Sequence, residues 1–130
     1  MAGELILIID DIAESRLLVN DVLTYNGYRL IEADRAETGI LLARERRPAL
    51  ILMDIRLPGI DGYAALYALR AHPATHDIPV IAVTASAMTD ERSRIAGAGF
   101  DGYQDKPINI ANLVEAVRKM LARTARAATS

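Results

Sequence analysis

The chain has 130 residues, of which 52% are hydrophobic and 25% charged, and this predicts one globular domain that buries roughly two thirds of its unfolded surface. A formal net charge of −2, six aromatic residues (five Tyr and one Phe) and no cysteine exclude a nucleic-acid surface, disulfides and zinc–thiolate sites. No apolar run approaches the roughly 20 residues of a membrane span, and no signal peptide is visible. We therefore expect a cytoplasmic protein with no membrane or nucleic-acid partner.

Five apolar runs alternate with five helical patterns along the chain. Strands are predicted over residues 5–9, 28–33, 50–53, 79–84 and 102–104. Helices are predicted over residues 13–26, 35–47, 62–71, 88–96 and 109–123. This alternation is typical of βαβ units, with a parallel sheet covered by helices on both faces. The sequence thus predicts one α/β domain over residues 1–123 and a flexible C-terminal tail over 124–130.

Local signals refine the helices. Leu18, Val22 and Tyr25 form the predicted apolar stripe of the first helix, and Gly27 stands where a C-cap needs positive φ. Asp34 and Glu37 have the spacing of a capping box, with Asp as the cap. The last helix has a predicted apolar stripe of Ile110, Leu113, Val117, Met120 and Leu121.

Polar residues follow four of the predicted strands. The buried run of residues 50–53 ends in Asp54, and Pro58-Gly59 prevents the strand from continuing. Asp10-Asp11 follow the first strand, Thr84 ends the fourth, and Lys106 follows the fifth. Each could have a local role: the acids as helix or turn caps, Thr84 as an ordinary strand end, Lys106 as a surface lysine. In a parallel sheet, however, all four positions lie at the carboxyl edge, where ligands bind in open α/β folds.

Together these side chains suit phosphoryl transfer. Three close carboxylates repel one another by several kcal/mol per pair at an effective dielectric constant of about 20, so a cation is needed to neutralise them. All-oxygen ligands favour Mg²⁺. Asp54 is the candidate nucleophile, because carboxylates form aspartyl phosphates. Lys106 and Thr84 would stabilise charge on the transferred group.

These motifs strongly resemble the receiver domain of two-component response regulators, in its single-domain, chemotaxis-regulator-like form. The resemblance spans roughly Glu4 to Arg123 and rests on the motifs Asp10-Asp11, Asp54 with Leu57-Pro58-Gly59, Asp61-Gly62, Thr84-Ala85 and Lys106-Pro107. It implies a doubly wound, flavodoxin-like fold with five parallel strands in the order 2-1-3-4-5 and five helices. It also implies a signalling protein rather than a conventional enzyme, with its own Mg²⁺-dependent phosphorylation and dephosphorylation chemistry.

The same resemblance implies roles for single residues. Asp54 would be phosphorylated by a histidine kinase or histidine phosphotransfer protein, with Thr84 and Lys106 contacting the phosphoryl group. The implied Mg²⁺ ligands are Asp10, Asp11, Asp54 and the backbone carbonyl of Arg56. Thr84 and Tyr103 would act as the conformational switch, and Pro107 would follow a cis peptide bond. A downstream protein target would bind the surface made by the fourth and fifth helices and the strand between them.

Two residues depart from the pattern of the receiver family, and three alternative functions have to be weighed against it. Arg56 reaches over the predicted site, and we hypothesise that its cation changes the phosphate lifetime. Asp105 could compete with the site for Lys106. A Mg²⁺-dependent phosphatase or phosphotransferase would carry a second acid near its Asp nucleophile, which Asp54-Ile55-Arg56 lacks. A flavodoxin-like cofactor binder would not place two acids after the first strand, and a receiver that signals without phosphorylation would not need every key position filled.

Overall fold

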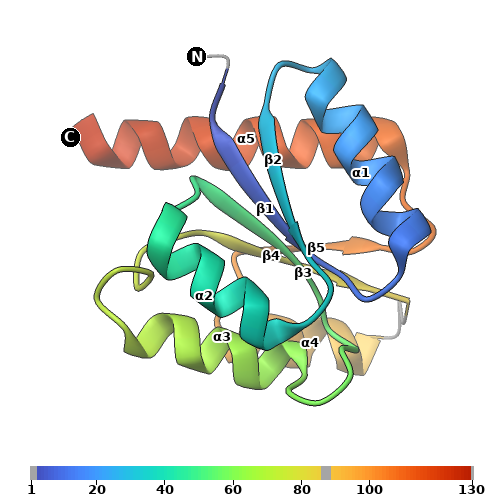
Figure 1. Cartoon of the computed structure of the whole chain (residues 1–130), viewed down its shortest axis with the longest axis vertical. Coiled ribbons are helices and arrows are strands. Elements are labelled where there is room, and N and C mark those ends of the chain that lie inside the picture. Colours follow the sequence, from blue (N-terminus) through green and yellow to red (C-terminus); the bar gives the residue numbers. More distant parts are fainter. Residues whose placement is uncertain (1–2, 86–88, 130) are drawn as a thin grey trace.

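Five parallel strands form one sheet in the order β2-β1-β3-β4-β5 in the computed structural model of the chain, which describes residues 3–85 and 89–129 (Figure 1). The strands are β1 (Leu5–Ile9), β2 (Arg29–Ala33), β3 (Leu50–Asp54), β4 (Val80–Thr84) and β5 (Gly102–Asp105). The helices are α1 (Ala13–Tyr25), α2 (Ala36–Arg46), α3 (Gly62–Ala71), α4 (Thr89–Ala98) and α5 (Ile110–Thr129). The predicted doubly wound α/β fold and its strand order are confirmed.

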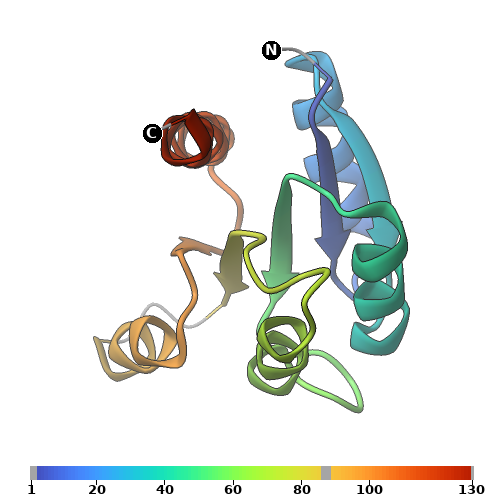
Figure 2. The same cartoon turned by 90° about the vertical axis from the view of Figure 1, so that its left-hand side faces the viewer.

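Helices cover both faces of the sheet (Figures 1 and 2). On one face, buried residues of α2, α3 and α4 form a core cluster with alternate strand residues such as Leu7, Ile51 and Ala82. On the other face, α1 and α5 pack on Ile6, Leu52 and Ile81. The two clusters exist because successive strand residues point to opposite sides of the sheet.

Strand composition follows from burial on both faces. Every residue of β1, β3 and β4 is buried, which explains their continuous apolar runs. The edge strands β2 and β5 are only partly buried and contain polar residues. Of the described helices, none is both long and apolar enough to cross a membrane.

The apolar stripe predicted for α1 is confirmed at Val22, which is partly buried against the core, but is wrong at Leu18 and Tyr25. Val19 and Leu23 are the buried residues of this helix, whereas Leu18 is 38% exposed and Tyr25 is 90% exposed. The two sets have similar spacing, so periodicity alone does not decide which one faces the sheet. In α5 the stripe is correct except at Ile110, which is 52% exposed at the first position of the helix.

Several helix ends also differ from the sequence predictions. The capping box at Asp34 is not formed: Arg35 is the N-cap of α2 and makes no side-chain capping bond, because Asp34 lies one residue too early. Asp61 does cap α3, since its Oδ1 accepts the Ala64 N–H at 3.0 Å. The predicted start of the fourth helix at Met88 lies outside the described residues. Helix α5 continues beyond the predicted end at Arg123, in an alanine-rich segment with high helix propensity.

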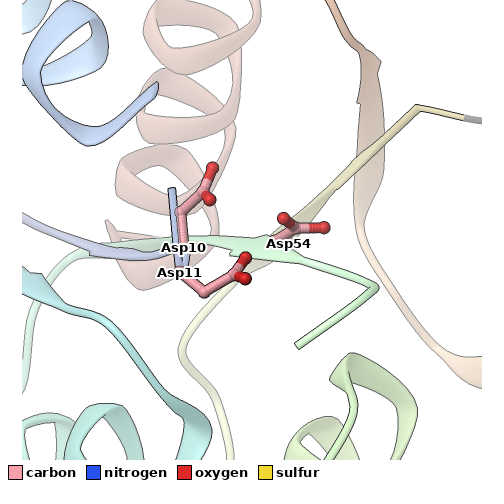
Figure 3. A group of neighbouring side chains, drawn as sticks. All are labelled: Asp10, Asp11 and Asp54. Atoms are coloured by element: carbon pink, nitrogen blue, oxygen red, sulfur yellow. The ribbon is translucent and has the colours of Figure 1, made fainter. Parts of the chain in front are cut away.

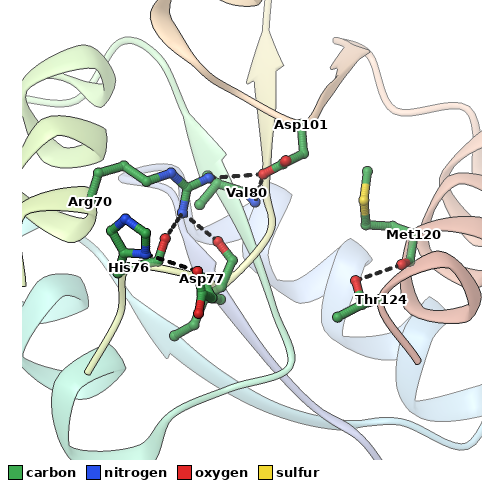
Figure 4. A network of polar contacts seen from close by, with 8 residues as sticks. Arg70, His76, Asp77, Val80, Asp101, Met120 and Thr124 are labelled. Carbon is green, nitrogen blue, oxygen red and sulfur yellow. Dashed lines mark hydrogen bonds and ion pairs between the residues drawn. The ribbon is translucent and has the colours of Figure 1, made fainter. Parts of the chain in front are cut away.

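A polar network holds the amino end of β4 and β5, at the opposite edge of the sheet from the acidic residues (Figure 4). One oxygen of Asp101, Oδ2, accepts both an Arg70 N–H at 2.9 Å and the Val80 N–H at 2.8 Å. Arg70 also donates to the carbonyl oxygens of Ile78 at 2.6 Å and His76 at 3.2 Å. Helix α3 is thus connected to the first residue of β4 and to the residue that precedes β5.

Candidate functional site

The register of the sheet explains how distant residues meet at its carboxyl edge. Ile9 of β1 pairs with Met53 of β3, so the residues that follow them, Asp10 and Asp54, are neighbours. On the other side of β3, Asp54 pairs with Val83, and Thr84 follows. Thr84 in turn pairs with Asp105, and the Lys106 N–H donates to the Thr84 carbonyl at 2.8 Å. Strand pairing alone therefore brings four segments together.

Lys106 connects two of the acids directly. Its Nζ lies 3.0 Å from Asp10 Oδ2 and 3.0 Å from Asp54 Oδ2. The side chains are largely buried, with 14% of Lys106 and 7% of each aspartate exposed. The ammonium therefore faces the acidic site and not Asp105, the competitor suggested by the sequence.

Backbone N–H groups fix the other oxygen of each acid. Asp10 Oδ1 accepts the Ile12 N–H at 2.9 Å, and Asp54 Oδ1 accepts the Arg56 N–H at 3.0 Å. Both contacts span two residues, so each carboxylate folds over the turn that follows its strand. The two buried acids are consequently held in place by short-range as well as long-range contacts.

Burial is the largest influence on the charged groups of the site. Burial raises the pKa of the Asp54 carboxyl; the Arg56 N–H and Lys106 offset part of this, and the nearby Asp10 carboxylate adds to the rise. For Lys106, burial lowers the pKa, but its hydrogen bonds to Asp10 and Asp54 outweigh burial, and the pKa lies above its usual value. Lys106 therefore stays protonated, and its single positive charge faces a cluster of three aspartates, which a further cation would stabilise.

The three aspartates of the site could bind a divalent cation. Asp10, Asp11 and Asp54 each offer a carboxylate oxygen, and these oxygens lie within 4.8 Å of one another (Figure 3). Asp10 and Asp54 are buried while Asp11 is exposed, so the cluster opens to solvent on one side. A set made only of carboxylate oxygens suits Mg²⁺, which completes its coordination with water.

The remaining predicted residues lie around this cluster. Thr84 is fully buried at the end of β4, next to Asp54 by register. Tyr103 is half-buried in β5, and the Arg92 guanidinium of α4 lies 5.3 Å from its ring centroid. The Arg56 side chain is exposed, and the Lys106–Pro107 peptide bond is cis. The roles of Thr84 and Tyr103 as a switch, and of the Arg56 carbonyl as a metal ligand, stay predictions.

Gly62 is a structural requirement of the site that sequence reasoning missed. A Cβ at this first residue of α3 would lie 2.8 Å from Ile55 Cα and 2.9 Å from the Asp54 carbonyl oxygen. The Gly62 N–H also donates to the Ile55 carbonyl at 2.9 Å. The sequence shows only an Asp-Gly pair before a helix, and the close approach to β3 depends on tertiary packing.

Substituting Gly62 with alanine is therefore expected to lower the free energy of unfolding by about 1–3 kcal/mol, because the atoms it meets are rigid backbone. Chemical denaturation measures this loss. Gly97→Ala in α4 is the matched control, since a Cβ there meets nothing within 4 Å, and alanine is the better helix former. Equal stability of the two variants would contradict the steric requirement at Gly62.

Residues 6–118 match the family model of the response regulator receiver domain, and the chain therefore belongs to this family of two-component signalling proteins. The polar-differentiation response regulator DivK of Brucella anthropi is 36% identical over 116 residues, which are 89% of this chain and 94% of that protein. Phosphorylation on an aspartate is characteristic of the family, whose members are signalling proteins and not conventional enzymes.

Solved structures agree with this assignment. The receiver domain of a sensor histidine kinase from Pseudomonas aeruginosa PAO1 superposes with a TM-score of 0.86 and 31% identity, over 93% of this chain and 99% of the other. That structure has a magnesium ion coordinated in its active-site cleft. A response regulator from Desulfuromonas acetoxidans gives a TM-score of 0.85 with 25% identity, over 92% of this chain and 97% of the other.

Proposed function

We propose that this protein is a phosphoacceptor switch in which a histidine kinase or histidine phosphotransfer protein transfers a phosphoryl group to Asp54. The observation that carries this proposal is the position of Asp54: a buried carboxylate at a strand end, 3.0 Å from Lys106 and beside two further acids. In the transfer, an Asp54 oxygen attacks phosphorus while the bond from phosphorus to the donor histidine nitrogen breaks. The histidine leaves with the electron pair of that bond.

The chain's own groups would assist at defined atoms. Lys106 Nζ is placed to donate a charge-assisted hydrogen bond to a phosphoryl oxygen on Asp54, because it already lies 3.0 Å from Asp54 Oδ2. Asp10, Asp11 and Asp54, with the Arg56 carbonyl, would hold Mg²⁺. When bound, Mg²⁺ supplies Lewis-acid charge stabilisation to the phosphoryl oxygens. The Thr84 hydroxyl would donate to a further phosphoryl oxygen.

The output would be a shift in a pre-existing equilibrium at the surface formed by α4, β5 and α5, where a downstream protein binds. Tyr103 of β5 belongs to this surface, and the Arg92 guanidinium of α4 lies 5.3 Å from its ring centroid. Movement of Thr84 toward the phosphoryl group would free space for the Tyr103 ring. Phosphorylation would thereby change both β5 and the α4 contact.

Acetyl phosphate tests this proposal without a partner protein. The protein is incubated with acetyl phosphate and Mg²⁺, and its intact mass is followed over time. We expect the mass to increase by one phosphoryl group when Mg²⁺ is present. When excess chelator is added before acetyl phosphate, the mass should not change. Absence of any mass gain, with a known receiver phosphorylated in parallel, would contradict the proposal.

Arg56 offers a second, independent prediction. Its exposed guanidinium follows Asp54 by two residues and would pair with a phosphoryl oxygen on that carboxylate. We expect Arg56→Asn to change the half-life of the phosphorylated protein by about 3- to 10-fold, the size of one charge-assisted contact of roughly 1 kcal/mol. Loss of the phosphoryl mass after removal of acetyl phosphate measures this half-life.

The control for this experiment is Arg44→Asn, which removes an exposed arginine near the end of α2. Its half-life should equal that of the parent protein. Identical half-lives for Arg56→Asn and the parent would show that Arg56 does not act on the phosphoryl group.

A further inference from the structure

Arg16 of α1 links the backbone of the acidic site to the neighbouring strand β2. Its Nη1 donates to the Asp10 carbonyl oxygen at 2.6 Å, and its Nε donates to Glu32 Oε1 at 3.1 Å. The other Glu32 oxygen accepts Asn20 Nδ2 at 2.6 Å. Only 19% of the Arg16 side chain is exposed. Arg16 therefore joins α1 to the end of β1 and to β2, and among the described residues its side chain donates to no carboxylate of the site.

The carbonyl that Arg16 holds belongs to the peptide group between Asp10 and Asp11. This peptide group is planar, so fixing its oxygen fixes the direction in which the chain continues to Asp11. The other polar groups of Asp10 are also held: its N–H donates to the Ala33 carbonyl at 3.0 Å, and its carboxylate contacts Ile12 and Lys106.

Among the described residues, by contrast, no hydrogen bond or ion pair holds the carboxylate of Asp11. Asp11 is exposed, and its carboxylate reaches the cluster from the solvent side. The orientation of its backbone therefore decides where its carboxylate lies. Side chains hold both peptide groups that flank Asp11: Arg16 holds the one before it at the Asp10 carbonyl, and the Asp10 carboxylate holds the one after it at the Ile12 N–H.

The charge of Arg16 and its hydrogen bond should have opposite effects on the affinity of the site for a cation. A positive charge close to a cation site repels the cation, so removing it by itself would tighten cation binding. Glu32 already pairs with the guanidinium, which reduces this effect. Loss of the hydrogen bond would instead loosen the peptide group and weaken cation binding. Removal of Arg16 should therefore tighten cation binding if its charge matters most, and weaken cation binding if its hydrogen bond matters most.

We propose that Arg16 is a positioning residue for the cation site: it orients the Asp10–Asp11 peptide group and thereby places Asp11 as a ligand. The proposal rests on the proposed function for the identity of the cation, Mg²⁺, and on the contacts of Arg16 for everything else.

The test compares Arg16→Met with Arg16→Lys. Methionine keeps the length of the side chain but removes its donors and its charge, whereas lysine restores the charge and a donor. We expect the Mg²⁺ dissociation constant, measured by NMR titration of backbone amides, to rise about 10-fold in Arg16→Met, the lower end of the effects seen for groups that orient metal ligands. Arg16→Lys should recover at least part of this loss.

Arg29→Met is the matched control. Arg29 also donates to a backbone carbonyl, that of Gly3, at 2.6 Å, but it does so at the amino end of β2. Its removal should leave Mg²⁺ affinity at the parent value. Unchanged or tighter Mg²⁺ binding in Arg16→Met, or a lysine variant no better than the methionine variant, would overturn the proposal.

Hydrogen exchange at the Asp11 and Ile12 amides, measured without metal, gives a second readout. These amides should exchange faster in Arg16→Met than in the parent and the Arg29 variant, and unchanged rates would overturn the positioning role. If the parent protein failed to bind Mg²⁺, the proposed metal would be wrong, and the exchange rates would still decide whether Arg16 orders this turn.

Discussion

Replacing Asp54 with asparagine is expected to abolish the mass gain from acetyl phosphate completely. The amide is not a nucleophile toward phosphorus, while its oxygen can still accept the Arg56 N–H that Asp54 Oδ1 accepts at 3.0 Å. The local geometry is therefore retained and only the chemistry is lost. Intact mass spectrometry after incubation with acetyl phosphate and Mg²⁺ measures the effect.

Asp105→Asn is the control for this variant, because Asp105 is an exposed acid at the end of β5 that makes no recorded contact with Lys106. It should be phosphorylated at the parent rate. A phosphoryl group that persisted on Asp54→Asn, or that mapped to Asp10 or Asp11, would show that a different carboxylate is the acceptor.

Replacing Lys106 with methionine should cause the largest loss of stability among these variants, about 3 kcal/mol in the free energy of unfolding without metal. Its ammonium contacts two aspartates that are each 7% exposed, and removing it leaves two buried carboxylates without their cation. Urea denaturation measures the loss. Phosphorylation by acetyl phosphate should also become slower, because the cation that faces Asp54 is gone.

Added Mg²⁺ should restore part of this stability, since a bound cation compensates the same carboxylates and favours the folded state. Lys119→Met is the control: its Nζ lies 3.8 Å from Glu115, the side chain is 70% exposed, and little change is expected. If Lys106→Met were as stable as Lys119→Met, the contacts of Lys106 would contribute nothing to folding.

Much of the architecture could be predicted from the sequence because its strands are buried on both faces. Residues 5–9 and 50–54 are continuous apolar runs ending in acids, and no solvent-facing helix has that composition. Once the strands were known to be parallel, their carboxyl ends had to share an edge, which brought Asp10, Asp54 and Lys106 into one region. The acidic cluster thus depends on topology more than on side-chain detail.

Features that depend on tertiary packing were less accessible. In α1 the predicted residues Leu18 and Tyr25 are exposed, because Val19 and Leu23 have a similar helical spacing and only packing against the sheet decides which residues are buried. The requirement for glycine at position 62 arises from the close approach of α3 to β3. Arg16 looks like any solvated helix residue until the positions of Glu32 and the Asp10 carbonyl are known.

The Arg70–Asp101 contact has a mechanical consequence for signalling. Asp101 joins the amino ends of β4 and β5 by accepting the Val80 N–H. Arg70, which contacts Asp101, also donates to the Ile78 carbonyl in the loop before β4. With that end anchored, any displacement of Thr84 or Tyr103 on phosphorylation would be smallest at the amino ends of β4 and β5 and largest near their carboxyl ends. Such a displacement would then act mainly on the helices next to the acidic site and less on the rest of the sheet.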